Sequence, residues 1–207
     1  MHHASITAAS RFTRVLLIVK ADIEEYRRYL GGAKVEAVRY AIDVNEFVPA
    51  PEVARTPGMI VVTGSMFYAP NVDAVLYFHR EIFPLVRRAV PDATLWIVGA
   101  RPTASLCKLA TAPGVHVTGS VDDVRPYVHR AMVSVCPVLL NVGTQTKVLE
   151  ALGMATPVVT TSAGNHGIAA SSGSELLVAD SPADFAAAVV SLLQGKNVDD
   201  MTRRGRE

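Results

Sequence analysis

The stretch Met59-Ile60-Val61-Val62-Thr63-Gly64-Ser65 decides the fold of this chain. Its almost continuous apolar run indicates a strand buried on both faces, because a half-buried strand would alternate apolar and polar residues. Five further runs of this kind occur, at residues 15–19, 94–98, 115–118, 132–136 and 157–161. Together the six runs predict the strands of a parallel sheet that is covered on both sides.

Segments with helical spacing separate these runs, at residues 71–89, 122–131, 144–154 and 182–193. In the first segment we expect Asn71 to cap the helix and Pro84 to kink it. In the last, Ser181 is the predicted cap, Pro182 takes the first helical position, and Asp184 suits the positive end of the helix dipole. Strands that alternate with helices in this way predict a Rossmann-like, doubly wound α/β domain with a parallel sheet.

The first 50 residues fit this domain poorly. They indicate a strand at 15–19, a helix near 22–30, a short apolar run at 35–40 and a proline-rich linker at 43–57. We therefore expect the chain to have three parts, at residues 1–50, 51–197 and 198–207, of which the second is the α/β domain and the third a C-terminal tail.

Composition narrows the class of protein. Half of the 207 residues are hydrophobic, so a sizeable core can form. The 20 Lys and Arg residues against 19 Asp and Glu give a net charge of +1, which supplies no basic surplus for binding nucleic acid. No apolar run is long enough to span a membrane. Cys107 and Cys136 lie outside any metal-binding pattern, so we expect two free, buried thiols, no metal site and a reducing compartment without a secretory signal.

Glycine follows three of the predicted strands, at Gly64, Gly99 and Gly119. In open α/β sheets ligands bind at the carboxyl ends of the strands, where glycine lets the backbone approach a ligand. A tight turn explains each glycine singly, but three at one edge of a sheet favour a binding cleft. The dinucleotide and Walker A fingerprints are both absent from the sequence.

The sharpest pattern is Leu140-Asn141-Val142-Gly143-Thr144-Gln145-Thr146-Lys147-Val148-Leu149-Glu150-Ala151-Leu152, in which a glycine loop opens a helix directly after a strand. Free amides at a helix start can hold phosphate. Lys147 would lie in the first turn, where a cation is unfavourable unless an anion is near. Glu150 follows on the same face, where a carboxylate could accept hydrogen bonds from a ribose diol. A solvent-exposed Lys–Glu pair explains the spacing equally well.

In these segments the chain resembles the C-terminal, donor-binding domain of GT-B fold retaining glycosyltransferases, above all bacterial enzymes that make surface polysaccharides and exopolysaccharides. The segments that carry the resemblance follow the family's order and spacing, at residues 41–49, 62–71, 95–102, 117–124, 143–151 and 157–159. Each motif is weak alone, whereas the ordered set, which extends over residues 41–195, is specific.

The resemblance implies that a nucleotide-diphospho-sugar of the UDP or GDP type lies across the strand ends. The residues that would hold the diphosphate are Gly64, Ser65, Gly143, Thr144, Gln145, Lys147 and Val148. Those that would border the base are Gly99, Gly119, Ser120 and Val121. Glu150 matches the second acid of the family's Glu-x7-Glu pattern and would hold the ribose. Such hexosyltransferases retain the anomeric configuration and need no metal or separate cofactor. Lys147 and Glu150 are then the candidate catalytic residues, with Lys147 stabilising the departing nucleoside diphosphate.

Some features depart from the family pattern. The first acid of Glu-x7-Glu is replaced by Val142, and the Arg and Lys that many relatives carry after the run at 59–63 are not seen there. Residues 11–40 resemble only the end of the N-terminal acceptor domain, so we expect a chain that lacks most of that domain.

Two alternatives therefore stand beside a transferase that passes the sugar to a glycan or a lipid-linked sugar. One is a nucleotide-binding module without turnover, and the other is a nucleotide-sugar epimerase. Released nucleoside diphosphate or isomerised sugar would separate them, and we expect little or no transfer by this chain alone. The expected location is the cytoplasm, with contact at the inner membrane surface left open. Apolar surface near 15–19 and 67–68 predicts self-association or a separate acceptor domain as partner.

Overall fold

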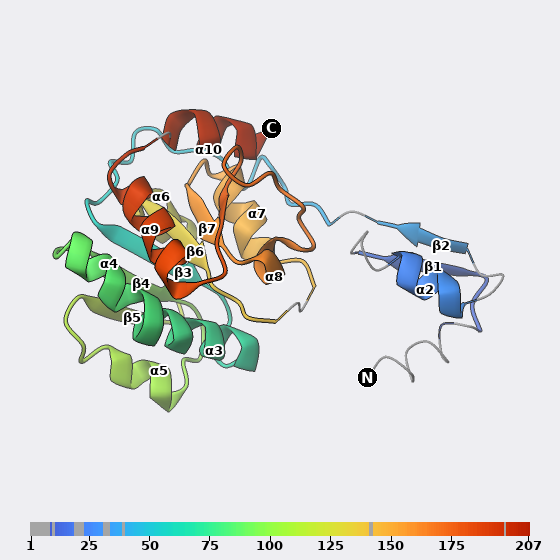
Figure 1. The fold of residues 1–207 in the computed structure, drawn as a ribbon, viewed down its shortest axis with the longest axis horizontal. Coiled ribbons are helices and arrows are strands. Elements are labelled where there is room, and N and C mark those ends of the chain that lie inside the picture. Colours follow the sequence, from blue (N-terminus) through green and yellow to red (C-terminus); the bar gives the residue numbers. More distant parts are fainter. Residues whose placement is uncertain are drawn as a thin grey trace.

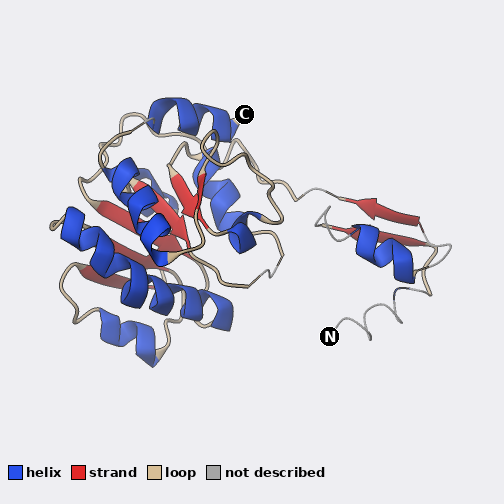
Figure 2. Ribbon diagram, viewed as in Figure 1, coloured by secondary structure: helices blue, strands red, loops and turns tan. Residues whose placement is uncertain are grey.

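The structure, a computed structural model, describes residues 9, 11–18, 23–30, 34–38, 40–140, 143–196 and 198–207. Its main part is a six-stranded sheet with helices on both faces (Figures 1 and 2). The strands are β3 (Met59–Thr63), β4 (Thr94–Val98), β5 (Val115–Gly119), β6 (Val133–Cys136), β7 (Val158–Thr160) and β8 (Leu177–Val178). All neighbouring pairs are parallel. The predicted Rossmann-like, doubly wound α/β fold is confirmed. Of the six predicted strands, the run at 15–19 belongs instead to a separate two-stranded sheet, and the two-residue strand β8 was too short to predict.

The order of the strands fixes where a ligand can bind. It runs β5-β4-β3-β6-β7-β8, so the chain first builds outward from β3 to one side and then returns to build outward from β6 on the other. Loops that follow β3 and β6 consequently diverge to opposite faces of the sheet. This switch point leaves a crevice at the carboxyl ends of the two strands, which is where open α/β sheets hold their ligands.

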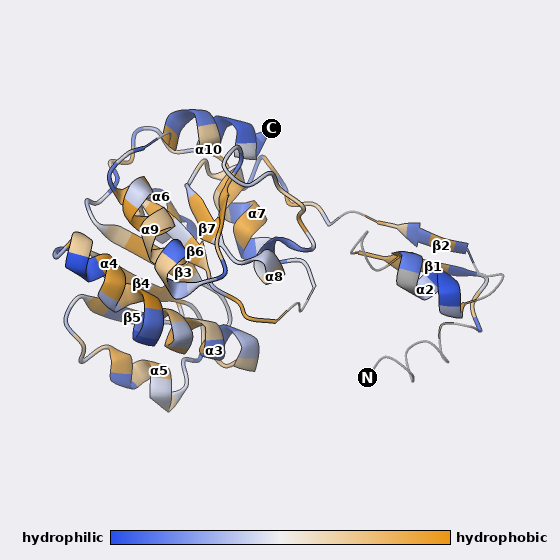
Figure 3. Cartoon of the chain, in the orientation of Figure 1, coloured by the Kyte–Doolittle hydropathy of each residue, from blue (hydrophilic) through white to orange (hydrophobic). Residues whose placement is uncertain are grey.

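Two layers of helices bury the two faces of the sheet. Figure 3 shows the strands of the domain coloured predominantly as apolar between helices with mixed faces. One apolar cluster joins Phe78 and Phe185 to Ile60 of β3, and a second joins Val128 and Val148 to other sheet residues. The helices against the first cluster are α3 (Ala69–Tyr77), α4 (Phe83–Ala89), α5 (Ala104–Leu109) and α9 (Pro182–Leu193); those against the second are α6 (Arg125–Arg130) and α7 (Thr146–Gly153). None of the helices within the described ranges is long and apolar enough to cross a bilayer.

The helix expected at 71–89 begins earlier and contains an irregular turn. It starts with α3 at Ala69, so Asn71 lies inside the helix and the prediction that it caps the helix was wrong. Between α3 and α4 the chain forms a π-helical turn, η2 (Phe78–Ile82), in which the amide of Phe83 donates to the carbonyl of Phe78. Pro84 explains this wider turn, because proline has no amide to donate and its ring crowds the carbonyl four residues earlier. At α9, by contrast, the predicted cap is confirmed, since the Ser181 hydroxyl accepts a hydrogen bond from the amide of Asp184.

The N-terminal residues form a small unit of their own. Strands β1 (Arg14–Leu17) and β2 (Lys34–Ala37) pair in parallel, with α2 (Ile23–Tyr29) between them in the sequence. Its buried residues, Ile23, Leu30 and Val35, form a cluster separate from the two clusters of the main sheet. The predicted strand at 15–19 is thus found, although Val19 lies outside the described residues. The side chains of Leu16 and Ile18 are exposed, as are Phe67 and Tyr68 in the main domain, so the expected apolar surface exists and self-association stays a prediction.

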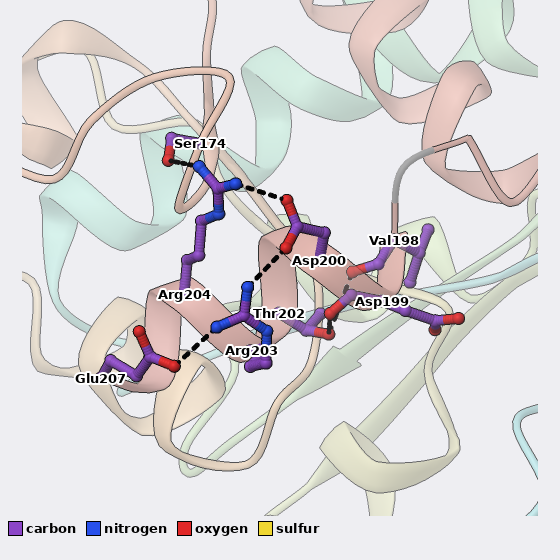
Figure 4. A network of polar contacts seen from close by, with 8 residues as sticks. All are labelled: Ser174, Val198, Asp199, Asp200, Thr202, Arg203, Arg204 and Glu207. Atoms are coloured by element: carbon purple, nitrogen blue, oxygen red, sulfur yellow. Dashed lines mark hydrogen bonds and ion pairs between the residues drawn. The ribbon is translucent and has the colours of Figure 1, made fainter.

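Residues that the sequence assigned to a C-terminal tail form a helix, α10 (Val198–Arg206), which packs against α7. Met201 is its buried residue. Arg203 forms ion pairs with Asp200 and Glu207, at 2.6 Å and 2.8 Å, along the exposed face (Figure 4). Acidic residues in its first turn and arginines in its last turn are typical of a helix that satisfies its dipole, and this signal in the sequence was missed.

The last arginine of α10 joins the helix to the linker and to the end of α7. The guanidinium of Arg206 donates to the carbonyls of Phe47 and Gly153, the first at 3.0 Å. In an Arg206→Gln variant we expect the free energy of unfolding to fall by about 1–3 kcal/mol, because partly buried carbonyls lose a charged donor. Urea denaturation would measure this loss. The matched Arg203→Gln variant removes only exposed ion pairs and should change stability by less than about 0.5 kcal/mol. Equal losses in both variants would contradict this role of Arg206.

Candidate functional site

Two segments from opposite sides of the switch point meet at the carboxyl edge of the sheet. Gly64 follows β3, and Lys147 lies in the first turn of α7, which follows β6. A Cβ atom built on Gly64 would lie 3.2 Å from the Lys147 Nζ, so the ammonium lies directly beside the Gly64 backbone. The sequence predicted both residues as diphosphate ligands, and the structure brings them together.

The loops after β3 and β4 are also joined. A Cβ on Gly99 would lie 1.8 Å from the Gly64 carbonyl oxygen, which no side chain could tolerate. The amide of Gly64 donates to the Val98 carbonyl at 3.1 Å, and the amide of Met66 donates to the Ala100 carbonyl at 2.9 Å. Glycine at position 99 therefore allows the ends of β3 and β4 to approach closely. This contact fixes the position of the Gly64 backbone.

The start of α7 has no side-chain cap from its own N-cap residue. Gln145 is the residue before the helix, its side chain forms no cap, and the first turn contains no acid. Amides in the first turn of a helix have no acceptor within the helix, and they carry the positive end of its dipole. The space beside Gly143 is open, because a Cβ built there would meet nothing within 4 Å. The arrangement suits an anion, and no side chain of the helix start competes for it.

Lys147 is partly buried, and its ammonium is held by a residue that the sequence assigned elsewhere. The Lys147 Nζ donates to the Asn71 Oδ1 at 2.6 Å. Burial lowers the pKa of Lys147, while the nearby Cys136 and Glu150 act in the opposite direction. A solvent-exposed Lys–Glu pair, the alternative that the spacing left open, does not describe this geometry. A partly buried cation whose hydrogen-bond partner is neutral loses hydration and is stabilised by a nearby anion.

Glu150 lies one turn further along α7 and is half-buried. Burial raises the pKa of its carboxyl above the ordinary value, although a hydrogen bond from Thr146 and the charge of Lys147 lower it. The charge of Glu46, in the linker, adds to the upward shift. A carboxylate in such a setting gains from hydroxyl donors, so the expected ribose contact is chemically reasonable.

The remaining predicted residues of the helix start have different surroundings. The Thr144 Oγ1 is buried and finds no hydrogen-bond partner among the residues that the structure describes. The buried Gln145 accepts a hydrogen bond from the Cys136 thiol at 3.8 Å. Val148 is a packing residue: its side chain is buried, and its amide already donates to the Gln145 carbonyl at 3.0 Å. The prediction that Val148 contacts the diphosphate therefore lacks a free group to make that contact.

The cysteines match the sequence expectation only in part. Both thiols are free. Cys136 is buried at the end of β6, and burial raises the pKa of its thiol, whereas Cys107 on α5 is exposed. The expectation that both are buried was wrong for Cys107, because α5 packs Leu106 and Leu109 against the core and leaves Cys107 exposed.

The residues predicted to border a base follow β5. Gly119 ends the strand and has open space where a side chain would lie. Ser120 is exposed, and Val121 is half-buried against the second apolar cluster. These residues leave room at the sheet edge but present no charged group there.

One cation at this edge of the sheet, Arg101, was not predicted from the sequence. The guanidinium of Arg101 lies 3.6 Å from the centroid of the Phe67 ring, a cation–π contact between the loops after β4 and β3. No Arg or Lys follows β3 in the sequence, but Arg101 reaches the β3 loop from its neighbour. Pairing across two strands leaves no local signal in the sequence. Val142, which replaces the first acid of the family's Glu-x7-Glu pattern, lies outside the described residues.

Comparison with known proteins gives the family. The family model described as glycosyl transferases group 1 matches residues 57–195, which include Gly64, Lys147 and Glu150. The chain belongs to this family. An uncharacterized 44.6 kDa protein in the cps region of Klebsiella pneumoniae is 23% identical over 150 residues, which are 69% of this chain and 38% of that protein.

Solved structures share the fold at low identity. The pneumococcal O-GlcNAc transferase GtfA, in complex with UDP and GlcNAc, matches 99% of this chain with a TM-score of 0.76 and 14% identity. A variant of S. aureus TarM, in a complex that includes UDP, also matches 99% of the chain, with a TM-score of 0.81 and 12% identity. The chain covers 43% and 42% of those two chains. It therefore corresponds to part of a GT-B glycosyltransferase, with the Rossmann-like fold of the C-terminal domain, and spans less than half the length of these relatives.

Proposed function

We propose that this chain is the donor-binding part of a retaining glycosyltransferase and holds a nucleotide-diphospho-sugar at the switch point of its sheet. One observation carries the proposal: the Lys147 ammonium lies beside the Gly64 backbone at the uncapped start of α7. Free amides, a helix dipole and a partly buried cation meet there, and a diphosphate is the sugar-donor group that would stabilise all three.

The chemistry of the proposal is electrostatic. In glycosyl transfer the bond between the anomeric carbon and the diphosphate oxygen breaks, and the oxygen leaves with the electron pair. The acceptor hydroxyl forms the new bond to the anomeric carbon and gives its proton to the departing phosphate oxygen. Negative charge on the diphosphate rises as the bond breaks. The α7 amides and Lys147 are fixed in advance where that charge would develop, which is the arrangement that lowers a barrier of this kind.

The donor in this proposal is of the UDP or GDP type, and the acceptor is a growing glycan or a lipid-linked sugar. Two of the structural relatives were solved with UDP, which makes UDP the first ligand to test. The Klebsiella relative is named for its place in the cps region, which supports a role in polysaccharide synthesis. Glu150 would hold the ribose, and Gly119, Ser120 and Val121 would border the base.

The proposal is tested by calorimetric titration with UDP, GDP and ADP and with inorganic pyrophosphate, which has no ribose. We expect one nucleoside diphosphate to bind more tightly than its nucleoside and than pyrophosphate. In a Glu150→Gln variant the affinity for that nucleotide should fall about tenfold, because two hydroxyls lose an ionised acceptor, while pyrophosphate binds as before. Acidification should weaken wild-type binding as Glu150 protonates, and this should begin at a higher pH than for an ordinary Glu because its pKa is raised.

The matched control is Glu52→Gln, which removes a carboxylate from the exposed linker and should leave all affinities unchanged. Absence of binding by every nucleoside diphosphate would refute the donor-binding proposal. If Glu150→Gln weakened pyrophosphate and nucleotide alike, the assignment of the ribose to Glu150 would be wrong.

A further inference from the structure

Asn71 connects the two halves of the proposed diphosphate site. It lies in the first turn of α3, and its side chain uses both ends of the amide. The Oδ1 accepts from the Lys147 Nζ at 2.6 Å, and the Nδ2 donates to the Ser65 carbonyl at 3.0 Å. A Cβ on Gly64 would lie 3.0 Å from the same Nδ2 and 3.2 Å from the Lys147 Nζ. One amide thus holds the ammonium of α7 against the loop after β3.

The lack of charge on Asn71, the hydrogen-bond partner of Lys147, matters as much as its position. A carboxylate at this place would hold the ammonium equally well and cancel its charge. An amide oxygen accepts one hydrogen bond and adds no negative charge, so of the two neighbours Asn71 and Glu150 only the Glu150 carboxylate on α7 offsets the ammonium. The ammonium has three donors, and among the described residues Asn71 is the hydrogen-bond acceptor that the structure gives it, which leaves two donors for phosphate oxygens.

We infer that Asn71 is a positioning residue, which fixes the Lys147 ammonium beside Gly64 and adds no negative charge of its own at the place proposed for a diphosphate. The inference rests on the proposed function, because it concerns the same site. It adds that this family member controls the charge of its phosphate site through a neutral amide on α3, supplied from across the switch point.

Two substitutions at one position separate charge from shape. Asn71→Asp has nearly the same shape and keeps an acceptor for Lys147, but it neutralises the ammonium. Asn71→Ala keeps the charge and releases the side chain. Both substitutions also remove the hydrogen bond that the Asn71 Nδ2 donates to the Ser65 carbonyl, so thermal unfolding of each variant measures that loss separately from binding. Our inference concerns charge: we expect UDP affinity to fall about fivefold in Asn71→Ala and about fiftyfold in Asn71→Asp.

Calorimetric titration with UDP, with pyrophosphate and with uridine measures the effect. Both variants should weaken UDP and pyrophosphate together, whereas uridine, which has no phosphate, should bind each variant as it binds the wild type. Thermal unfolding of each variant checks that it folds. The matched control is Asn45→Asp, an equal charge change in the exposed linker, which should leave the three affinities unchanged.

The inference is overturned if Asn71→Asp binds UDP as tightly as Asn71→Ala does, or if uridine loses as much affinity as UDP. Failure of the proposed function gives a different result. In that case wild-type protein binds no nucleoside diphosphate at all, whereas failure of the inference alone leaves UDP binding dependent on Lys147 and indifferent to the charge at residue 71.

Discussion

A Lys147→Met variant should lose the affinity for UDP by about two orders of magnitude while the unliganded protein becomes more stable. Hydrogen bonds from a charged donor contribute about 1.5–3 kcal/mol each, so losing the ammonium removes at least a tenfold to hundredfold factor. Methionine keeps the length and flexibility of the side chain, so the packing of α7 should survive. Calorimetric titration measures the affinity, with pyrophosphate as a second ligand that should lose as much as UDP.

The gain in stability has a definite pH dependence. Burial lowers the pKa of Lys147 in the folded chain, while the unfolded chain keeps the ordinary value of 10.5. Between the two pKa values the unfolded state binds more protons than the folded state, so wild-type stability rises with pH in that window. The Lys147→Met variant has no ionisable group at this position, so its stability lacks this dependence on pH. Its advantage, a higher melting temperature than the wild type at neutral pH, should therefore shrink as pH rises toward 10.

The control for this variant is Lys108→Met, because Lys108 is exposed on α5 and plays no part in the site. It should change neither UDP affinity nor the melting temperature appreciably. If the Lys147→Met variant bound UDP within threefold of the wild-type affinity, the role that the donor-binding proposal gives to Lys147 would be contradicted.

Gly99→Ala should be the most destabilising single substitution that we describe. The added Cβ would lie 1.8 Å from the Gly64 carbonyl oxygen, and the backbone of Gly99 has a φ of +151°, which a side chain rarely adopts. Both partners in this contact are backbone atoms between paired parallel strands, so neither can rotate away. We expect the free energy of unfolding to fall by more than about 4 kcal/mol, or the chain to fail to fold. Urea denaturation measures the loss, and expression as unfolded protein would count as the same result.

Gly119→Ala is the matched control, because it adds the same methyl group after the neighbouring strand. Its φ of +72° is also unfavourable for alanine, but its Cβ would meet nothing within 4 Å. The strain alone should cost about 1–2 kcal/mol. Losses of similar size in the two variants would mean that the close approach of Gly99 to Gly64 does not hold the loops together.

The sheet could be predicted because its signal is local. In a run such as Met59–Thr63, five consecutive apolar or small residues already indicate burial on both faces. Ser181 caps α9 through the amide of Asp184, only three residues further along the chain. Lys147 could be singled out for a similar reason, since a cation in the first turn of a helix is locally unfavourable. The helix α10 also had a local signal, in the charges at its two ends, and it was missed because the segment reads as a polar tail.

What the sequence could not show are contacts between distant segments. Asn71 after a proline suggests a helix cap, and its true partner, Lys147, lies on the other side of the switch point. The Arg101–Phe67 contact likewise joins two loops. The spacing between Lys147 and Glu150 left an exposed ion pair as an equal possibility, and the structure shows that Lys147 is partly buried and hydrogen-bonded to Asn71.

The site is assembled from a segment near Gly64 and a segment near Lys147, which meet only once the strands have ordered around the switch point. An unfolded chain therefore does not contain this site, and any ligand that binds here stabilises the folded state by mass action. At a concentration one hundred times its dissociation constant it would add about 2.7 kcal/mol to the free energy of unfolding. The folding equilibrium of the chain thus reports the occupancy of its site, even where no acceptor or product is known.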